Sequence, residues 1–274
     1  MRRYPGAAYI VGEMFEELSN NPTARITMKK TVAIIGAEGK MGSAMACVIA
    51  RAGYRTLISG HDYRDLLALV GRLPLLEAKI RMQVPQADMG IVIDPKEASW
   101  EADIIIPAVP YEAQAAVAQE IREFVTGKIV ISVVNPMNQG FSDLLTPHMK
   151  SAAEELAELL PHSRIVKAFN TIFATDVKVP DSKDQVADVF VAGDDSEAVT
   201  QVMELVRDTG FNPVNAGNLS MSRTLESMML LLMNIPRRNT CGSVTGWKVA
   251  QRSSLPGRPT PEKSTKFAAR NIES

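Results

Sequence analysis

The sequence has little of several features that mark specialised classes of protein. Only two of its 274 residues are cysteines, Cys47 and Cys241, which are too few for a disulfide framework and typical of reduced thiols. No apolar run reaches the roughly 18 residues of a membrane span. A net charge of −1 gives no electrostatic attraction to nucleic acid or to an anionic membrane. We therefore expect a cytoplasmic globular protein with neither of these partners.

The sequence also lacks an obvious acid–base pair. Its three histidines are scattered, and His148 and His162 each follow a proline in polar surroundings, where exposed loop positions are expected. It contains no Cys-x-x-Cys motif, no Ser/His/Asp order and no cluster with the spacing of metal ligands. We therefore expect no resident metal ion and no catalytic acid or base side chain.

The middle of the chain alternates between predicted strands and helices. Apolar runs at 31–36, 54–59, 102–109 and 128–135 predict strands, and amphipathic stretches at 40–52, 112–125 and 151–160 predict helices. A further helical stretch is expected from Asp62 to about Arg72. This alternation is typical of an α/β fold with a Rossmann-type doubly wound parallel sheet.

Composition divides the chain further. We interpret residues 1–28 as an N-terminal extension, 29–164 as a Rossmann domain, 165–249 as a second, smaller α/β capping domain and 250–274, rich in Ser, Pro and charge, as a disordered tail.

The stretch "AIIGAEGKMGSAMA" (33–46) places three glycines between the first strand and the first helix. Gly36 permits a tight turn, Gly39 lets a pyrophosphate approach the backbone, and Gly42 lets the helix lie close to the strand. The free N–H groups at the helix start favour an anion. A turn without a ligand is the alternative, but this context favours a dinucleotide. The candidate cofactor-binding residues are Gly36, Ala37, Glu38, Gly39, Lys40, Met41 and Gly42.

The end of the second strand, "ISGHDYRD", bears on which dinucleotide is bound. NAD sites usually place an acid here for the ribose 2′-hydroxyl, and Asp62 is a candidate that lies past the strand end. A 2′-phosphate would instead be held by the following residues: Ser59, Gly60, His61 and Arg64. An inward-pointing Glu38 would repel that phosphate. NADP is favoured, and NAD stays open.

Six motifs resemble one family in order along the chain: "IIGAEGKMG", "AVPYEA" (108–113), "VVNP" (133–136), "VKAFNT" (166–171), "VFVAGDD" (189–195) and "NAGNLSMSRTLES" (215–227). They resemble the NADP oxidoreductases that work with the deazaflavin coenzyme F420, whose related domains include ferric reductases. The resemblance implies a homodimer with a cleft between a Rossmann domain and a small capping domain. It also implies that Val109, Pro110 and Asn135 flank the nicotinamide, while Asn170 and Thr171 orient a small-molecule redox acceptor.

Hydride transfer between two stacked rings needs orientation rather than an acid–base pair, because the cofactors carry the chemistry. Two alternatives stay open: a hydroxyacid or prephenate-type dehydrogenase, which needs a base, and an NADP-binding redox sensor without turnover. Asn170 stands where deazaflavin-specific members tend to carry His. Lys167 lies beside the expected cleft and could point either way, and Arg223 could pair with Glu226 on one helix face.

Overall fold

The computed structural model describes residues 29–61, 66–146, 149–177, 186–238 and 246–250. These residues form one eight-stranded sheet in the order β3-β2-β1-β4-β5-β6-β7-β8. Its strands are β1 (Thr31–Ile35), β2 (Arg55–Ser59), β3 (Met89–Ile91), β4 (Ile104–Pro107), β5 (Ile129–Ser132), β6 (Arg164–Lys167), β7 (Asp188–Gly193) and β8 (Asn212–Gly217). All neighbours are parallel except β6 and β7, which are antiparallel.

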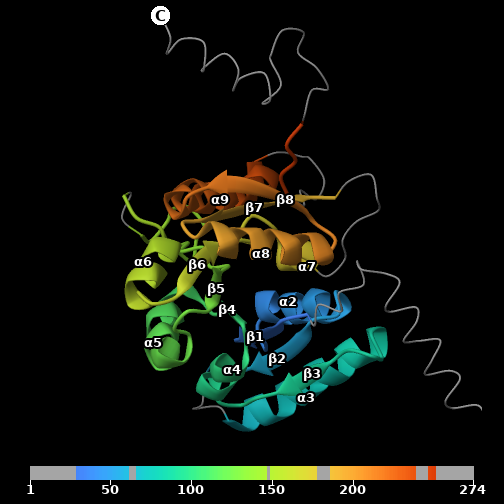
Figure 1. Ribbon diagram of the computed structural model, residues 1–274. Coiled ribbons are helices and arrows are strands. Elements are labelled where there is room, and N and C mark those ends of the chain that lie inside the picture. Colours follow the sequence, from blue (N-terminus) through green and yellow to red (C-terminus); the bar gives the residue numbers. More distant parts are fainter. Residues whose placement is uncertain (1–28, 62–65, 147–148, 178–185, 239–245, 251–274) are drawn as a thin grey trace, which may run out of the picture.

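Helices cover both faces of the sheet (Figure 1). They are α2 (Lys40–Arg51), α3 (Leu66–Gln83), α4 (Pro95–Glu101), α5 (Tyr111–Ile121), α6 (Ala152–Leu159), α7 (Ala174–Val177), α8 (Ser196–Asp208) and α9 (Ser222–Arg238), with 3₁₀ turns at Arg122–Phe124 and Leu219–Met221. In the part of the chain that is described, none of the helices combines the length and the apolar character needed to cross a membrane.

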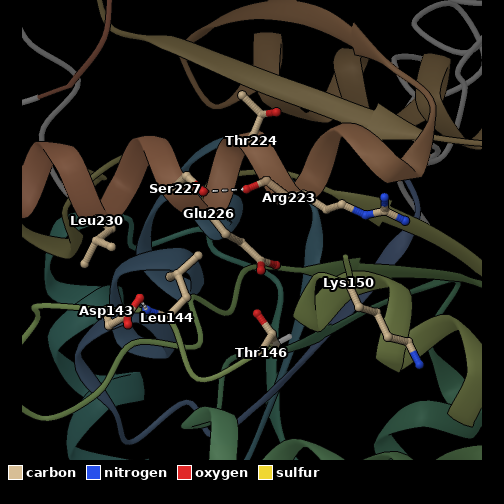
Figure 2. Close-up of a pocket in the computed structure, with 9 residues that line it drawn as sticks. All are labelled: Asp143, Leu144, Thr146, Lys150, Arg223, Thr224, Glu226, Ser227 and Leu230. Atoms are coloured by element: carbon tan, nitrogen blue, oxygen red, sulfur yellow. Dashed lines mark hydrogen bonds between the residues drawn. The ribbon is translucent and has the colours of Figure 1, made fainter. Parts of the chain in front are cut away.

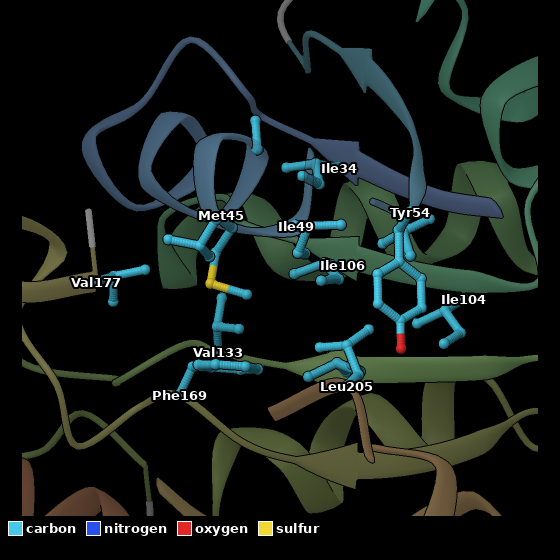
Figure 3. Packing of buried hydrophobic residues seen from close by; sticks show 14 of the residues in the cluster. Ile34, Met45, Ile49, Tyr54, Ile104, Ile106, Val133, Phe169, Val177 and Leu205 are labelled. Carbon is cyan, nitrogen blue, oxygen red and sulfur yellow. The ribbon is translucent and has the colours of Figure 1, made fainter. Parts of the chain in front are cut away.

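The alternation of side chains along β1 explains the two layers. Val32 and Ile34 join the apolar cluster that holds α2, α3 and α8, whereas Ala33 and Ile35 join the cluster on the other face with α4, α5 and α6. Figure 3 shows the first cluster, where Met45 of α2 and Leu205 of α8 pack over the sheet. Strands buried on both faces explain the continuous apolar runs, and the predicted doubly wound α/β fold is confirmed.

Some elements differ from the prediction. The helix expected to end near Arg72 continues to Gln83 and contains Pro74. Helix α4, which begins after the N-cap Asp94, was not predicted. The sheet runs without a break past residue 164, because β5 pairs with β6. The division into two domains there stays a prediction, and most of the proposed extension and tail lies outside the described residues.

Two glycines give opposite predictions for stability. A Cβ at Gly42 would lie 2.2 Å from the carbonyl oxygen of Gly36, so Gly42→Ala must push α2 off the β1 turn. We expect a loss of at least about 1–3 kcal/mol in the free energy of unfolding, the usual cost of overpacking. A Cβ at Gly71, inside α3, meets no atom within 4 Å, so Gly71→Ala should be neutral or stabilise by up to ~1 kcal/mol. Urea unfolding measures both, and similar losses for the two variants would contradict the packing argument.

Candidate dinucleotide and acceptor site

The strand order places the candidate site. Because β1 lies between β2 and β4, the chain reverses direction across the sheet at β1, and ligands of open α/β sheets bind at such a point, outside the carboxyl ends of the strands. The turns that follow β1, β4, β5 and β6 meet at this edge, since these strands are parallel neighbours. They are residues 36–42, 108–110, 133–136 and 168–171.

The glycine loop is shaped for an anion. Gly36 has φ +81°, and the N–H groups of Gly36 and Ala37 donate to the carbonyl of Ser59 at 2.8 and 3.0 Å, which ties the loop to β2. Helix α2 begins after Gly39 with no side-chain cap and no acidic residue in its first turn. The N–H groups of Lys40, Met41 and Gly42 therefore stand at an uncapped helix N-terminus, the arrangement that receives a pyrophosphate.

The β4 turn closes one side of this loop. A Cβ at Gly36 would lie 2.9 Å from both the carbonyl oxygen of Ala108 and a methyl group of Val109, so the two turns are in close contact. Val109 is buried and Pro110 is exposed as the N-cap residue of α5. These positions agree with a wall beside the dinucleotide, although contact with the nicotinamide stays a prediction for both residues.

The turn after β6 is strained and buried. Phe169 has φ +59°, which is rare for a bulky side chain and costs on the order of 1–3 kcal/mol. Asn170 is fully buried, and its Nδ2 donates to Oδ1 of Asn135 and to the carbonyl of Leu225, both at 3.0 Å. Asn135 in turn donates to the carbonyl of Asn170 at 2.8 Å. Asn170 therefore joins the β5 turn, the β6 turn and α9.

Two polar atoms of this turn have no hydrogen-bond partner among the described residues. They are Oδ1 of Asn170 and Oγ1 of Thr171, and both are buried. Neither residue is open to solvent, so a direct contact with an acceptor stays a prediction. A buried unsatisfied oxygen is costly, and sites of function are where such costs are often found.

The residues after β2 that bear on the choice between NADP and NAD divide into three groups. Ser59 is fully buried, and its hydroxyl donates to the carbonyl of Ile93 at 3.2 Å, so it stabilises the β2 end rather than facing a ligand. Gly60 is also buried, whereas His61 is partly exposed. Asp62 and Arg64 lie outside the described residues.

Glu38 contacts His61. Its Oε1 lies 2.6 Å from Nδ1 of His61, and its side chain is 10% exposed. Burial raises the pKa of Glu38, but the hydrogen bond from His61, backbone hydrogen bonds and the His61 charge together hold that pKa below its usual value. When His61 is protonated, it balances the carboxylate charge that would otherwise repel a 2′-phosphate.

A buried ion pair lies behind the turn that follows β6. Lys167 of β6 and Glu226 of α9 are both fully buried, with Nζ 2.6 Å from Oε1. Burial lowers the pKa of Lys167, and the Glu226 carboxylate opposes that shift. Arg223 does not pair with Glu226 as proposed above. It forms a bidentate contact with Glu154 of α6, with Nε 2.8 Å from Oε2.

Glu226 could have been recognised as part of a buried pair. It lies on the buried face of α9 together with Leu225, Met229 and Leu232, at helical spacing. A carboxylate within an apolar stripe calls for a buried partner, and Lys167 directly follows the buried residues Ile165 and Val166 of β6.

A pocket of about 340 Å³ lies beside this pair, between α9 and the segment that leads into α6. Figure 2 shows Glu226 pointing from α9 towards Leu144 and Thr146. The pocket lining is Asp143, Leu144, Thr146, Lys150, Arg223, Thr224, Glu226, Ser227 and Leu230.

Gly39 provides a test of the loop. Its φ of −76° suits any residue, and an added Cβ would lie 3.3 Å from the carbonyl oxygen of Gly36, so the protein should stay folded after a small adjustment. The valine side chain of Gly39→Val would occupy the space of the pyrophosphate. We expect dinucleotide affinity to fall at least about tenfold, or ~1.4 kcal/mol, by titration calorimetry. A cofactor-free melting curve is the control, and parental affinity in the folded variant would contradict the assignment.

The dinucleotide half of the chain matches a defined protein family. Residues 31–136 match the family described as "NADP oxidoreductase coenzyme F420-dependent". An F420-dependent NADP reductase of Methanocaldococcus jannaschii is 28% identical over 211 residues, which cover 74% of this chain and 91% of that protein. Human metalloreductase STEAP2 is 29% identical over 209 residues, covering 76% of this chain but only 38% of that longer protein.

Solved structures agree with the fold. A protein of Arthrobacter sp. FB24, provisionally described as an F420-dependent NADP reductase, superposes with a TM-score of 0.65 at 21% identity, over 76% of this chain and 93% of that one. A hypothetical protein of Sinorhizobium meliloti reaches a TM-score of 0.59 at 29% identity, over 72% and 89%. The glycine loop, the strand order and these relatives lead to one conclusion: residues 31–136 carry the domain of the coenzyme F420-dependent NADP oxidoreductases, and the chain is an NADP-dependent oxidoreductase.

Proposed function

We propose that this oxidoreductase transfers hydride between NADP(H) and a deazaflavin coenzyme at the carboxyl edge of the sheet. The dinucleotide would lie across the glycine loop, with its nicotinamide between the β4 and β5 turns. The acceptor ring would stack on it from the side of the β6 turn, oriented by Asn170 and Thr171. The relatives named for coenzyme F420 support this acceptor.

One observation carries the proposal: three buried or partly buried ionisable side chains around these turns are engaged with protein partners. Lys167 is paired with Glu226, and Glu38 contacts His61. The hydroxyl of Tyr111 donates to Glu155 at 2.8 Å, and burial together with that carboxylate raises its pKa to about 12. None of these groups is well placed to remove a substrate proton. A reaction whose chemistry is carried by the cofactors fits such a site, whereas a hydroxyacid dehydrogenase would need a base.

A second acceptor is supported by a separate observation. The chain is similar to metalloreductase STEAP2 over three quarters of its length. The family resemblance also implies that Asn170 stands where deazaflavin-specific members tend to carry His. A flavin or a ferric chelate is therefore the second candidate acceptor. Hydride would pass to a flavin ring, whereas ferric iron takes single electrons and would need such a ring as an intermediate carrier.

The acceptor experiment is a comparison of turnover under anaerobic conditions. NADPH oxidation is followed with coenzyme F420, with free FMN or FAD, and with a ferric chelate in the presence and absence of flavin. We expect the highest kcat/KM with coenzyme F420. A higher kcat/KM with flavin than with coenzyme F420 would make flavin, the second candidate, the preferred acceptor. Binding of NADPH without oxidation by any acceptor would favour the redox sensor.

His61 tests the choice between NADP and NAD. If its imidazolium contacts the 2′-phosphate, His61→Ala should weaken NADPH binding by about 1–2 kcal/mol, the scale of a hydrogen bond to a charged group. NADH affinity should stay within error. His162→Ala is the matched control, because that histidine is exposed in a different loop. Equal losses of NADPH and NADH affinity would show that His61 supports the loop rather than the phosphate.

A further inference from the structure

The Lys167–Glu226 pair has an energetic cost that calls for an explanation. Removing two charges from water is expensive, and replacing a buried ion pair by apolar side chains of similar volume is often neutral or stabilising. Both side chains are fully buried here, so solvent does not reduce that cost. The pair is therefore poorly explained by stability alone, and the groups that it contacts indicate what else it does.

The two charged groups together hold four segments. Nζ of Lys167 donates to the carbonyl of Val134 at 2.5 Å as well as to Glu226. The second carboxylate oxygen of Glu226 accepts from the N–H of Ala152, in the first turn of α6, at 3.1 Å. The β5 turn, β6, α6 and α9 are thereby joined at a single point.

Val134 is the residue immediately before Asn135. Its carbonyl is fixed by Lys167 on one side, and the amide of Asn135 is fixed by Asn170 on the other. Two residues therefore hold the β5 turn: Lys167, which belongs to β6, and Asn170, which follows it. A turn held in this way has little freedom to move relative to the acceptor turn.

We propose that Lys167 and Glu226 are positioning residues for hydride transfer, setting the β5 turn at the distance from the β6 turn that keeps nicotinamide and acceptor ring in register. This inference rests on the proposed placement of the nicotinamide beside Asn135. Neither side chain touches a reacting atom. Hydride transfer is sensitive to such geometry, since a displacement of about 1 Å can cost ~10²-fold in rate.

The test separates positioning from stability by removing both charges. Lys167→Met alone leaves a buried carboxylate and should lower the unfolding midpoint. The double variant Lys167→Met/Glu226→Leu keeps similar volumes without charge and should regain most of that midpoint. We expect its Kd for NADPH to stay within about threefold of the parent, while kcat falls about tenfold to hundredfold. Recovery of both the midpoint and kcat would overturn the proposal.

Arg223→Met is the matched control. It removes the ion pair between α9 and α6 without touching the β5 turn, so kcat should stay parental even if stability falls. An equal loss of kcat in this variant would show that kcat depends on the position of α9 rather than on the position of the β5 turn.

A measurement that needs no acceptor separates failure of the positioning role from failure of the proposed function. The fluorescence of bound NADPH reports the surroundings of the reduced ring, and the double variant should change its intensity at an unchanged Kd. If the parent reduces no acceptor, the proposed function fails, but the fluorescence still decides the positioning role. Unchanged fluorescence would overturn it.

Discussion

A lysine without access to water determines how the region around the β6 turn is assembled. Because Lys167 is buried in β6, a carboxylate opposite it stabilises its charge, and Glu226 of α9 provides that carboxylate. Since a helix is rigid, fixing one residue fixes its neighbours. Leu225 then offers its carbonyl to Asn170, and Arg223, almost one turn earlier, reaches Glu154 of α6.

The strain in the β6 turn fits this picture. Phe169 is held at a positive φ, and its ring packs edge-on against Phe211 with centroids 6.4 Å apart. Figure 3 shows Phe169 next to Val133 among the apolar side chains of this cluster. Apolar burial on one side of the turn and the hydrogen bonds of Asn170 on the other offset the backbone cost, so the turn keeps one conformation.

The dinucleotide half was predictable because its signals are local. The three glycines, the apolar strands and the amphipathic α2 lie close together in the sequence, and each was found where expected. The Asp94–Pro95 start of α4 is an equally local signal that was missed. Helix α3 could not be bounded in this way, because it continues through Pro74, where packing outweighs the local preference against proline.

The acceptor side was less predictable, because it depends on long-range partners. The pattern of β6 did not say which way Lys167 points, and Glu226 is 59 positions away in the sequence. Arg223 and Glu226 are neighbours on α9, so local spacing suggested that they pair, yet each found a partner on another element. Tertiary contacts outweigh an i,i+3 pair on the surface of a helix, because such a pair stabilises by only ~0.2–0.5 kcal/mol.

The glycine loop and the region around the β6 turn are therefore stabilised by different kinds of interaction. The glycine loop would bind its ligand with backbone N–H groups, so it places strict demands on only a few positions, of which Gly42 is the most constrained. The region around the β6 turn relies on complementary side chains from separate segments, because Lys167, Asn170 and Glu226 each need the others' elements in place. A change of acceptor would require concerted substitutions there. A single substitution would leave a buried charge or amide without its partner.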